Sequence, residues 1–175
     1  MSTSQAEITE GTLQAEDGMD QYLTFMLANE EYGVDILRVQ EIKGWDGVTP
    51  MPNMPCFILG VINLRGTVVP IIDLRKHFEL ESIPFDKTTV VIVVRVSDEE
   101  HGERTMGMVV DAVSEVHNIS ASELKPPPDF GGSISTDSIK GLATKNDQMI
   151  IILDIDHLMN TGVIKVLDEE EEDDA

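Results

Sequence analysis

Two stretches of this sequence occur twice, in the same order, so the chain contains an internal repeat. Residues 32–42 (YGVDILRVQEI) match residues 106–116 (MGMVVDAVSEV) at an offset of 74, and residues 60–78 match residues 141–159 at an offset of 81. Repeats with periods this long indicate duplication of a whole small domain, because solenoid units are shorter and need at least three copies. The repeat therefore predicts two related lobes.

A third and looser match sets the apolar segment 22–27 against 90–96, and it places the predicted boundary between the lobes near residues 85–90. A chain of 175 residues is long enough for one domain of ordinary size or for two very small ones. Because very small domains bury too little apolar surface on their own, we expect the two lobes to pack together and share an interface.

Acidic residues dominate the charge, and they gather at both ends of the chain. The net charge is −21, with five acids in residues 1–20 and seven in residues 168–174. Runs of like charge cannot build a core, so we expect residues 1–20 and 164–175 to be disordered. The middle of the chain is also acidic, which argues against nucleic acid or an anionic membrane surface as partner. The sequence shows no signal segment and no apolar run of about 18 residues, which predicts a cytosolic protein without membrane insertion.

Short segments rich in Val, Ile and Thr predict a mainly β fold with antiparallel strands. These segments are bounded by Gly, Pro, Asn or Asp, and they comprise residues 21–27, 67–73, 89–96, 105–113 and 149–155. Short helices are expected after Asp73 and Asp154, whose carboxylates can accept the unpaired amide hydrogens at a helix start. A structural role is therefore predicted for these two aspartates.

Signals for an enzyme are weak. The sequence contains no phosphate-binding or dinucleotide-binding glycine motif, no nucleophile elbow and no CxxC pair, and its four histidines lack zinc-site spacing. Cys56 has no identifiable base beside it. Asp35 with Glu41, and Asp111 with Glu115, could form acid–base pairs, but active sites are seldom built twice in lobes this small. We therefore predict no catalytic residues, no metal and no cofactor, and keep an acid–base enzyme as a remote alternative.

The two copies differ at the tip of one hairpin. Residues 63–66 read NLRG in the first copy, whereas residues 144–147 read TKND in the second. An apolar Leu64 at an exposed turn gains nothing unless something covers it, and the guanidinium of Arg65 is suited to bind a partner carboxylate in two places. An ordinary solvated hairpin is the alternative interpretation.

The strings EEYGVDILRVQEIKGWD, FILGVINLRGTVVPIIDLRKHF, VVDAVSEV and LDIDHLMN closely resemble the CheW family, the adaptor proteins of bacterial chemotaxis arrays. The similarity covers residues 21–163, in order, with an insertion-like stretch at 97–104. The resemblance implies two SH3-like five-stranded β-barrel lobes packed together. No kinase or receiver sequence is attached, so the chain resembles the stand-alone adaptor.

For function, the resemblance implies coupling without catalysis. Proteins of this family bind the cytoplasmic tip of chemoreceptors (methyl-accepting chemotaxis proteins) and the regulatory domain of the histidine kinase CheA, at the periphery of membrane receptor arrays. Because the kinase domain is itself a double lobe, head-to-tail contacts could close into rings. The alternative is a CheW-like adaptor of a different chemosensory kinase pathway, in twitching motility or development.

The family motifs assign roles to single residues by position. Leu64 and Arg65 are similar to residues that contact the kinase regulatory domain, and Phe130 resembles an aromatic at the other adaptor–kinase contact. Val39 and Glu41 match positions tied to the receptor tip, where Val39 would offer apolar area to a helix in the groove between the lobes. Each has a plain alternative, because Val39 and Phe130 could be core residues and Glu41 a surface residue.

Two glycines in the first copy are expected to be required by the backbone. Gly60 precedes the hairpin tip that differs between the copies, and Gly66 is the last residue of that tip. A side chain at either position would obstruct a turn or a close approach of two chain segments, and glycine avoids both problems.

Overall fold

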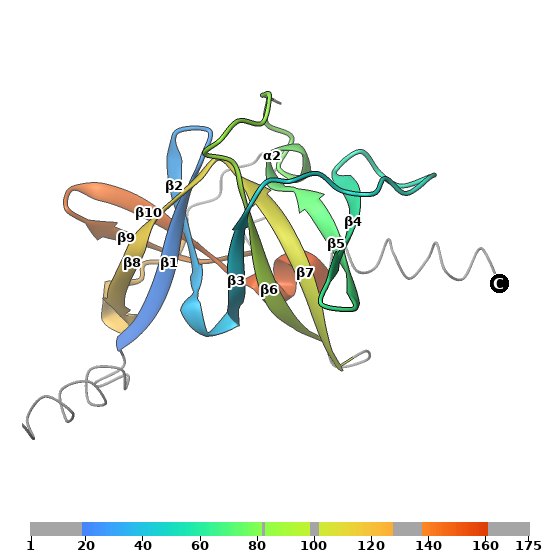
Figure 1. The fold of residues 1–175 in the computed structure, drawn as a ribbon. Coiled ribbons are helices and arrows are strands. Elements are labelled where there is room, and N and C mark those ends of the chain that lie inside the picture. The colour runs from blue at the N-terminus through green and yellow to red at the C-terminus, as the bar shows by residue number, and fades with distance from the viewer. Residues whose placement is uncertain (1–18, 82, 99–101, 128–137, 161–175) are drawn as a thin grey trace, which may run out of the picture.

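The computed structural model describes residues 19–81, 83–98, 102–127 and 138–160. Ten strands in these residues form two five-stranded sheets that lie side by side (Figure 1). The predicted mainly β fold with two five-stranded lobes is confirmed. Neither sheet closes into a complete barrel through strand pairing in this part of the chain, so the lobes are open, SH3-like sheets. The acidic ends for which disorder is predicted lie mostly outside the described residues, in 1–18 and 161–175.

Lobe A is the sheet with strand order β8-β1-β2-β10-β9. Its pairs are antiparallel except β2 with β10, which run parallel. The short helix α3 (Ile155–Leu158) follows β10, and the 3-10 turn η3 (Ala121–Glu123) follows β8. The strands are β1 (Met19–Leu27), β2 (Glu30–Asp35), β8 (Ala112–Ser120), β9 (Ile139–Lys145) and β10 (Gln148–Leu153).

Lobe B is the sheet with strand order β3-β6-β7-β5-β4. Its parallel pair is β5 with β7. The helix α2 (Leu74–His77) follows β5, and the 3-10 turn η2 (Ile36–Arg38) leads from lobe A into β3. The strands are β3 (Val39–Gly44), β4 (Ile58–Leu64), β5 (Thr67–Asp73), β6 (Val90–Asp98) and β7 (Gly102–Val110).

The two copies of the repeat exchange strands. The repeat aligns β1 to β5 with β6 to β10, and equivalent strands occupy the same place in the two sheet orders. Lobe A nevertheless combines β1 and β2 of the first copy with β8 to β10 of the second, and lobe B takes the remainder of each. The predicted lobe boundary near residues 85–90 is therefore contradicted. A repeat shows which segments are equivalent, and it does not show which copies pair.

The largest core cluster contains residues of both lobes and so joins them. Within it, Phe25 of β1 stacks on Tyr32 of β2 with ring centroids 5.9 Å apart. Tyr32 also contacts Phe78, which directly follows α2 in lobe B. Each sheet buries its other face in a smaller cluster of its own, around Tyr22 and Ile150 in lobe A and around Ile71, Val91 and Val93 in lobe B. Ile92 and Val94 of β6 belong to the cluster that joins the lobes. Burial on both faces explains why β6 is apolar at successive positions instead of alternating.

Both predicted capping aspartates cap their helices. Asp73 Oδ1 accepts a hydrogen bond from the Arg75 amide at 3.1 Å, and Asp154 Oδ1 accepts one from the His157 amide at 3.1 Å. The structural interpretation of these carboxylates is therefore confirmed. Among the described residues, none of the helices is both long and apolar enough to cross a membrane.

Candidate partner-binding surface

The tip of the β4–β5 hairpin places the Arg65 side chain in solvent. Arg65 and Gly66 both have positive φ, at 51° and 89°, as the tight two-residue hairpin turn requires. The Asn63 side chain closes the turn by accepting a hydrogen bond from the Gly66 amide at 2.9 Å. A Cβ on Gly66 would meet no atom within 4 Å, so glycine serves the backbone angle here and not a lack of space.

Arg65 forms an ion pair with Glu41. The guanidinium Nη2 lies 2.6 Å from Glu41 Oε1, and the side chains are 72% and 27% exposed. Glu41 belongs to β3 and Arg65 follows β4, and these strands are the two outer strands of lobe B. The structure therefore brings together two residues that the sequence assigned to different partners.

Leu64 is less exposed than the sequence suggested. Its side chain is half-buried and packs against the core cluster of lobe B, where it anchors the hairpin. The exposed apolar residue of this hairpin is Val68, which is 63% exposed and lies opposite Asn63. Sequence reasoning predicted a strand over residues 67–73 and did not single out Val68 as an exposed residue. The alternation at the start of β5 was the available signal.

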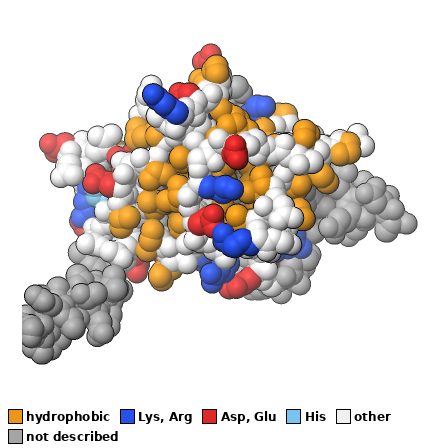
Figure 2. All heavy atoms as spheres, in the orientation of Figure 1, with side chains coloured by type: hydrophobic (Ala, Val, Ile, Leu, Met, Phe, Trp, Pro, Cys, Tyr) orange, Lys and Arg blue, Asp and Glu red, His pale blue; other side chains and the backbone are white. Residues whose placement is uncertain are grey.

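Val39 begins β3 directly after the crossing from lobe A. It is half-buried and packs against the cluster that joins the two lobes, so it combines a core role with some accessible area. A β-bulge lies between Val39 and Glu41 in the pairing with β6. Leu37, two residues before Val39, is 80% exposed, and sequence reasoning missed it. Figure 2 shows hydrophobic side chains spread over the face that contains β1, β3 and β6, with charged side chains between them.

Gly60 allows another segment to lie against the edge of β4. Thr49 and Val61 exchange two backbone hydrogen bonds of 2.9 Å, and a Cβ on Gly60 would overlap the Thr49 carbonyl. Gly60 also has φ of 151°, which other residues rarely adopt. Phe130, the remaining residue assigned from the sequence, lies outside the described residues.

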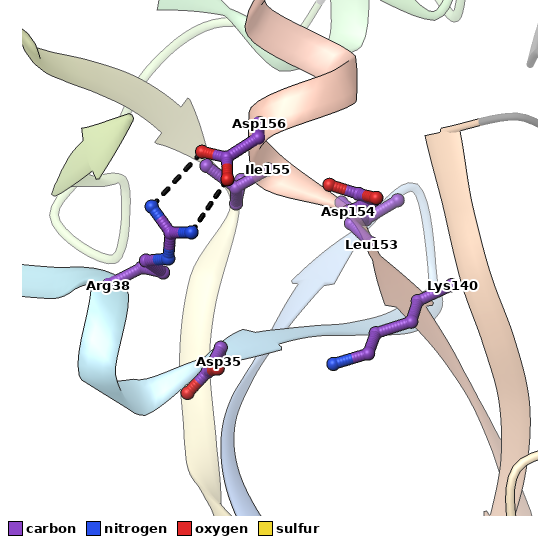
Figure 3. A pocket seen from close by; sticks show the side chains of 7 residues that line it. All are labelled: Asp35, Arg38, Lys140, Leu153, Asp154, Ile155 and Asp156. Atoms are coloured by element: carbon purple, nitrogen blue, oxygen red, sulfur yellow. Dashed lines mark hydrogen bonds and ion pairs between the residues drawn. The ribbon is translucent and has the colours of Figure 1, made fainter. Parts of the chain in front are cut away.

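A charged pocket of about 240 Å³ lies beside the crossing η2 (Figure 3). Arg38 pairs with Asp156 there, and the Lys140 ammonium lies 3.2 Å from the Tyr22 hydroxyl. Burial by itself would lower the pKa of Lys140, but the hydrogen bond to Tyr22 raises it above its ordinary value. The lining residues are Asp35, Arg38, Lys140, Leu153, Asp154, Ile155 and Asp156.

Three carboxylates of the two acid–base pairs considered from the sequence, Asp35, Glu41 and Asp111, have other partners. Asp35 accepts a hydrogen bond from the Leu37 amide at 3.0 Å, while Glu41 pairs with Arg65. In the second copy, Asp111 pairs with an arginine and does not face Glu115 as an acid–base partner. In the described part of the chain, no group of three or more His, Cys, Asp or Glu side chains could hold a metal ion. This arrangement suits binding by surface contact better than it suits catalysis.

Comparisons with known proteins give one consistent family. The CheW-like domain model matches residues 21–162. The chemotaxis protein CheW of Klebsiella aerogenes is 42% identical over 160 residues, which cover 91% of this chain and 93% of that protein. Protein FrzA of Myxococcus xanthus is 27% identical, with 81% and 86% covered. The crystal structure of the scaffolding protein TtCheW from Thermoanaerobacter tengcongensis matches with a TM-score of 0.71 and 37% identity, covering 80% of this chain and 87% of that one.

Proposed function

This chain belongs to the CheW family of chemotaxis scaffolding adaptors, and we propose that it couples the cytoplasmic tips of chemoreceptors to the regulatory domain of a CheA-type histidine kinase. Proteins of this family are adaptors without catalytic activity, so the function lies in the surfaces that bind partners. The proposal places the chain in the cytoplasm, at the periphery of membrane receptor arrays.

The main support for the proposed kinase contact is the exposed ion pair of Arg65 and Glu41. A guanidinium has five N–H donors, and Glu41 accepts from only one nitrogen of Arg65. Because 72% of the Arg65 side chain is exposed, its other donors can reach a carboxylate of the kinase domain. Val68 supplies exposed apolar area on the same hairpin, and Leu64 anchors the hairpin by packing against the smaller core cluster of lobe B.

The receptor contact is proposed for the start of β3, where the chain passes between the lobes. Leu37 and Val39 offer apolar side chains there, and Glu41 lies two residues further along. An amphipathic helix can place apolar side chains at spaced positions along a groove of this kind. The equivalence of the two lobes would also permit a second contact with a homologous double lobe, and such head-to-tail contacts can close into rings.

A calorimetric titration tests the kinase contact. The chain is titrated into the isolated regulatory domain of a CheA-type kinase from the same cell, as wild type and as Arg65→Glu. We expect micromolar or tighter binding by the wild type and at least about tenfold weaker binding by the variant, because a buried contact would hold two like charges. Arg95→Glu, an equal change of charge at an exposed position of β6, is the control and should bind like the wild type. Equal affinity of Arg65→Glu and wild type would contradict the contact.

A second candidate is an adaptor for another chemosensory kinase pathway, in twitching motility or development. The similarity to FrzA favours it, because that relative carries a name other than CheW. Absence of binding by well-folded wild type in the same titration, together with binding to a different kinase of that cell, would support this candidate.

A further inference from the structure

Two arginine–aspartate pairs hold the places where the chain crosses between the lobes. Arg75 of α2 binds Asp111 through Nε at 2.8 Å and Nη2 at 2.7 Å, and Asp111 lies at the crossing from β7 to β8. Arg38, at the crossing from β2 to β3, binds Asp156 of α3 through Nη1 at 3.0 Å and Nη2 at 2.6 Å (Figure 3). Both pairs are bidentate, which is the strong geometry for these groups.

Each aspartate also accepts a backbone hydrogen bond. The donor belongs to the lobe that does not contain the helix of that ion pair. Asp111 Oδ2 accepts one from the Ala28 amide of lobe A at 2.9 Å, and Asp156 Oδ1 accepts one from the Ser97 amide of lobe B at 2.8 Å. Burial by itself would raise the pKa of Asp111, but the hydrogen bonds from Arg75 and Ala28 lower it below its ordinary value. Each pair therefore links a crossing, a helix and the opposite lobe.

The repeat relates these two pairs, and their charges are reversed. Arg75 and Asp156 are equivalent residues of α2 and α3 at the offset of 81. At the offset of 74, Arg38 is equivalent to Ala112, the neighbour of Asp111. In one pair the arginine is on the helix and the aspartate on the crossing. In the other pair the two positions hold the opposite charges.

Charge reversal separates the observed fold from a competing one. In the observed fold β2 lies beside β10 and β7 beside β5, so each crossing meets the helix of the other copy. If each copy folded on itself, β2 would lie beside β5 and β7 beside β10. Arg38 would then meet Arg75, and Asp111 would meet Asp156. Like charges in these half-buried places would be costly, because neither would have a counter-ion.

The packing of the parallel strands does not distinguish the exchanged fold from the self-paired fold. A Cβ on Gly33 would lie 2.8 Å from Ile152 Cδ1, and a Cβ on Gly107 would lie 2.5 Å from Ile71 Cδ1. The same glycine would face the same type of side chain in both folds, because Ile71 and Ile152 are equivalent in the repeat. The glycine contacts are therefore the same in both copies, whereas the charges at the crossings differ between the copies.

We propose that the reversed ion pairs Arg75–Asp111 and Arg38–Asp156 specify the exchange of strands between the two copies. They act by favouring the observed pairing and by placing like charges together in the self-paired alternative. This device fixes which strands build each lobe, and it is independent of the proposed partners.

Cysteine pairs can report the two folds. Gln21 of β1 lies opposite Asn118 of β8, and Gly44 is the equivalent of Asn118 in the first copy. In chains with Cys56→Ser, the pair Gln21→Cys/Asn118→Cys forms a disulfide in the exchanged fold, and Gln21→Cys/Gly44→Cys forms one in the self-paired fold. Each chain is unfolded, refolded and oxidised, and the disulfide is measured in the monomer fraction.

The decisive variants reverse the crossings alone or together with the helices. Arg38→Asp/Asp111→Arg places like charges together in the exchanged fold, and we expect its 21–118 disulfide to fall at least about tenfold. Adding Arg75→Asp/Asp156→Arg restores opposite charges in the exchanged fold only, and should raise the 21–118 disulfide severalfold above the yield of the double variant. The arginines at 111 and 156 no longer accept hydrogen bonds from the Ala28 and Ser97 amides, so the yield stays below that of the wild type. A wild-type yield in the double variant would overturn the proposal. So would a quadruple variant whose 21–118 disulfide does not rise above that of the double variant, because these two variants differ in whether the crossing pairs have opposite or like charges.

Discussion

The Arg65 guanidinium and the Glu41 carboxylate lie 2.6 Å apart and connect the two outer strands of lobe B. Arg65 belongs to the proposed kinase contact and Glu41 to the proposed receptor contact. A partner that binds Arg65 must therefore share it with Glu41 or displace Glu41. The pair offers a physical link between the two proposed contacts, although each contact uses a different strand.

Glu41→Gln tests whether this pair serves binding more than stability. Exposed ion pairs contribute little, so we expect the free energy of unfolding to change by less than about 1 kcal/mol. Affinity for the kinase regulatory domain should fall by about threefold to tenfold, because Arg65 loses the carboxylate that orients it. Urea unfolding and calorimetry measure the two effects. Glu115→Gln, at the equivalent place in lobe A, is the control, and an equal loss of affinity there would contradict the role of Glu41.

Gly60→Ala should lower the free energy of unfolding by more than about 2 kcal/mol. The added Cβ would overlap the Thr49 carbonyl, and the backbone angle of Gly60 is one that alanine rarely adopts. Gly44→Ala should change stability by less than about 0.5 kcal/mol, because nothing lies within 4 Å of its Cβ position. Urea unfolding compares the two variants. Equal free energies of unfolding would show that the segment at Thr49 can move away from the added Cβ without destabilising the fold.

Gly33→Ala should destabilise the chain by about 1–3 kcal/mol, because its Cβ would lie 2.8 Å from Ile152 Cδ1. Ile152→Val removes that atom and should recover part of the loss. The double variant is therefore expected to be more stable than the sum of the single changes predicts, by about 1 kcal/mol. A double-mutant cycle in urea measures this coupling. Strict additivity would mean that the two side chains do not meet.

Burial lowers the pKa of His77 below its ordinary value of 6.5. The unfolded chain then binds a proton more readily than the folded chain, so stability is present above pH 6.5 and declines as the pH falls through the lowered pKa. His77→Phe keeps an aromatic ring against Phe57 and Phe78 and removes the titration. Unfolding measured from pH 7.5 down to pH 5 should show a shallower decline in this variant. Identical pH profiles would rule out His77 as a source of the dependence.

Much of the fold was predictable because apolar runs and caps are local signals. The segments 67–73 and 89–96 are strands within a residue or two, and Asp73 and Asp154 cap their helices as expected. Strands such as β3 and β9 were harder, because they are outer strands with mixed polarity and lack a continuous apolar run.

The exchange of strands and the site geometry depend on long-range contacts, which a single sequence does not contain. Both pairings of the copies satisfy the glycine and isoleucine pattern, so the repeat could not show which one forms. The same limit applies to the surface. The sequence identified Arg65 and Glu41 separately, but their contact arises only when β3 and β4 lie at the two edges of one sheet.

Coupling can be measured as the autophosphorylation rate of the CheA-type kinase in the presence of receptor signalling fragments, with and without this chain. We expect the rate to depend on the receptor fragments only when the chain is present, and we expect Arg65→Glu to lose this effect while Arg95→Glu keeps it. A kinase that responds equally to the receptor fragments without the chain would contradict coupling as its function.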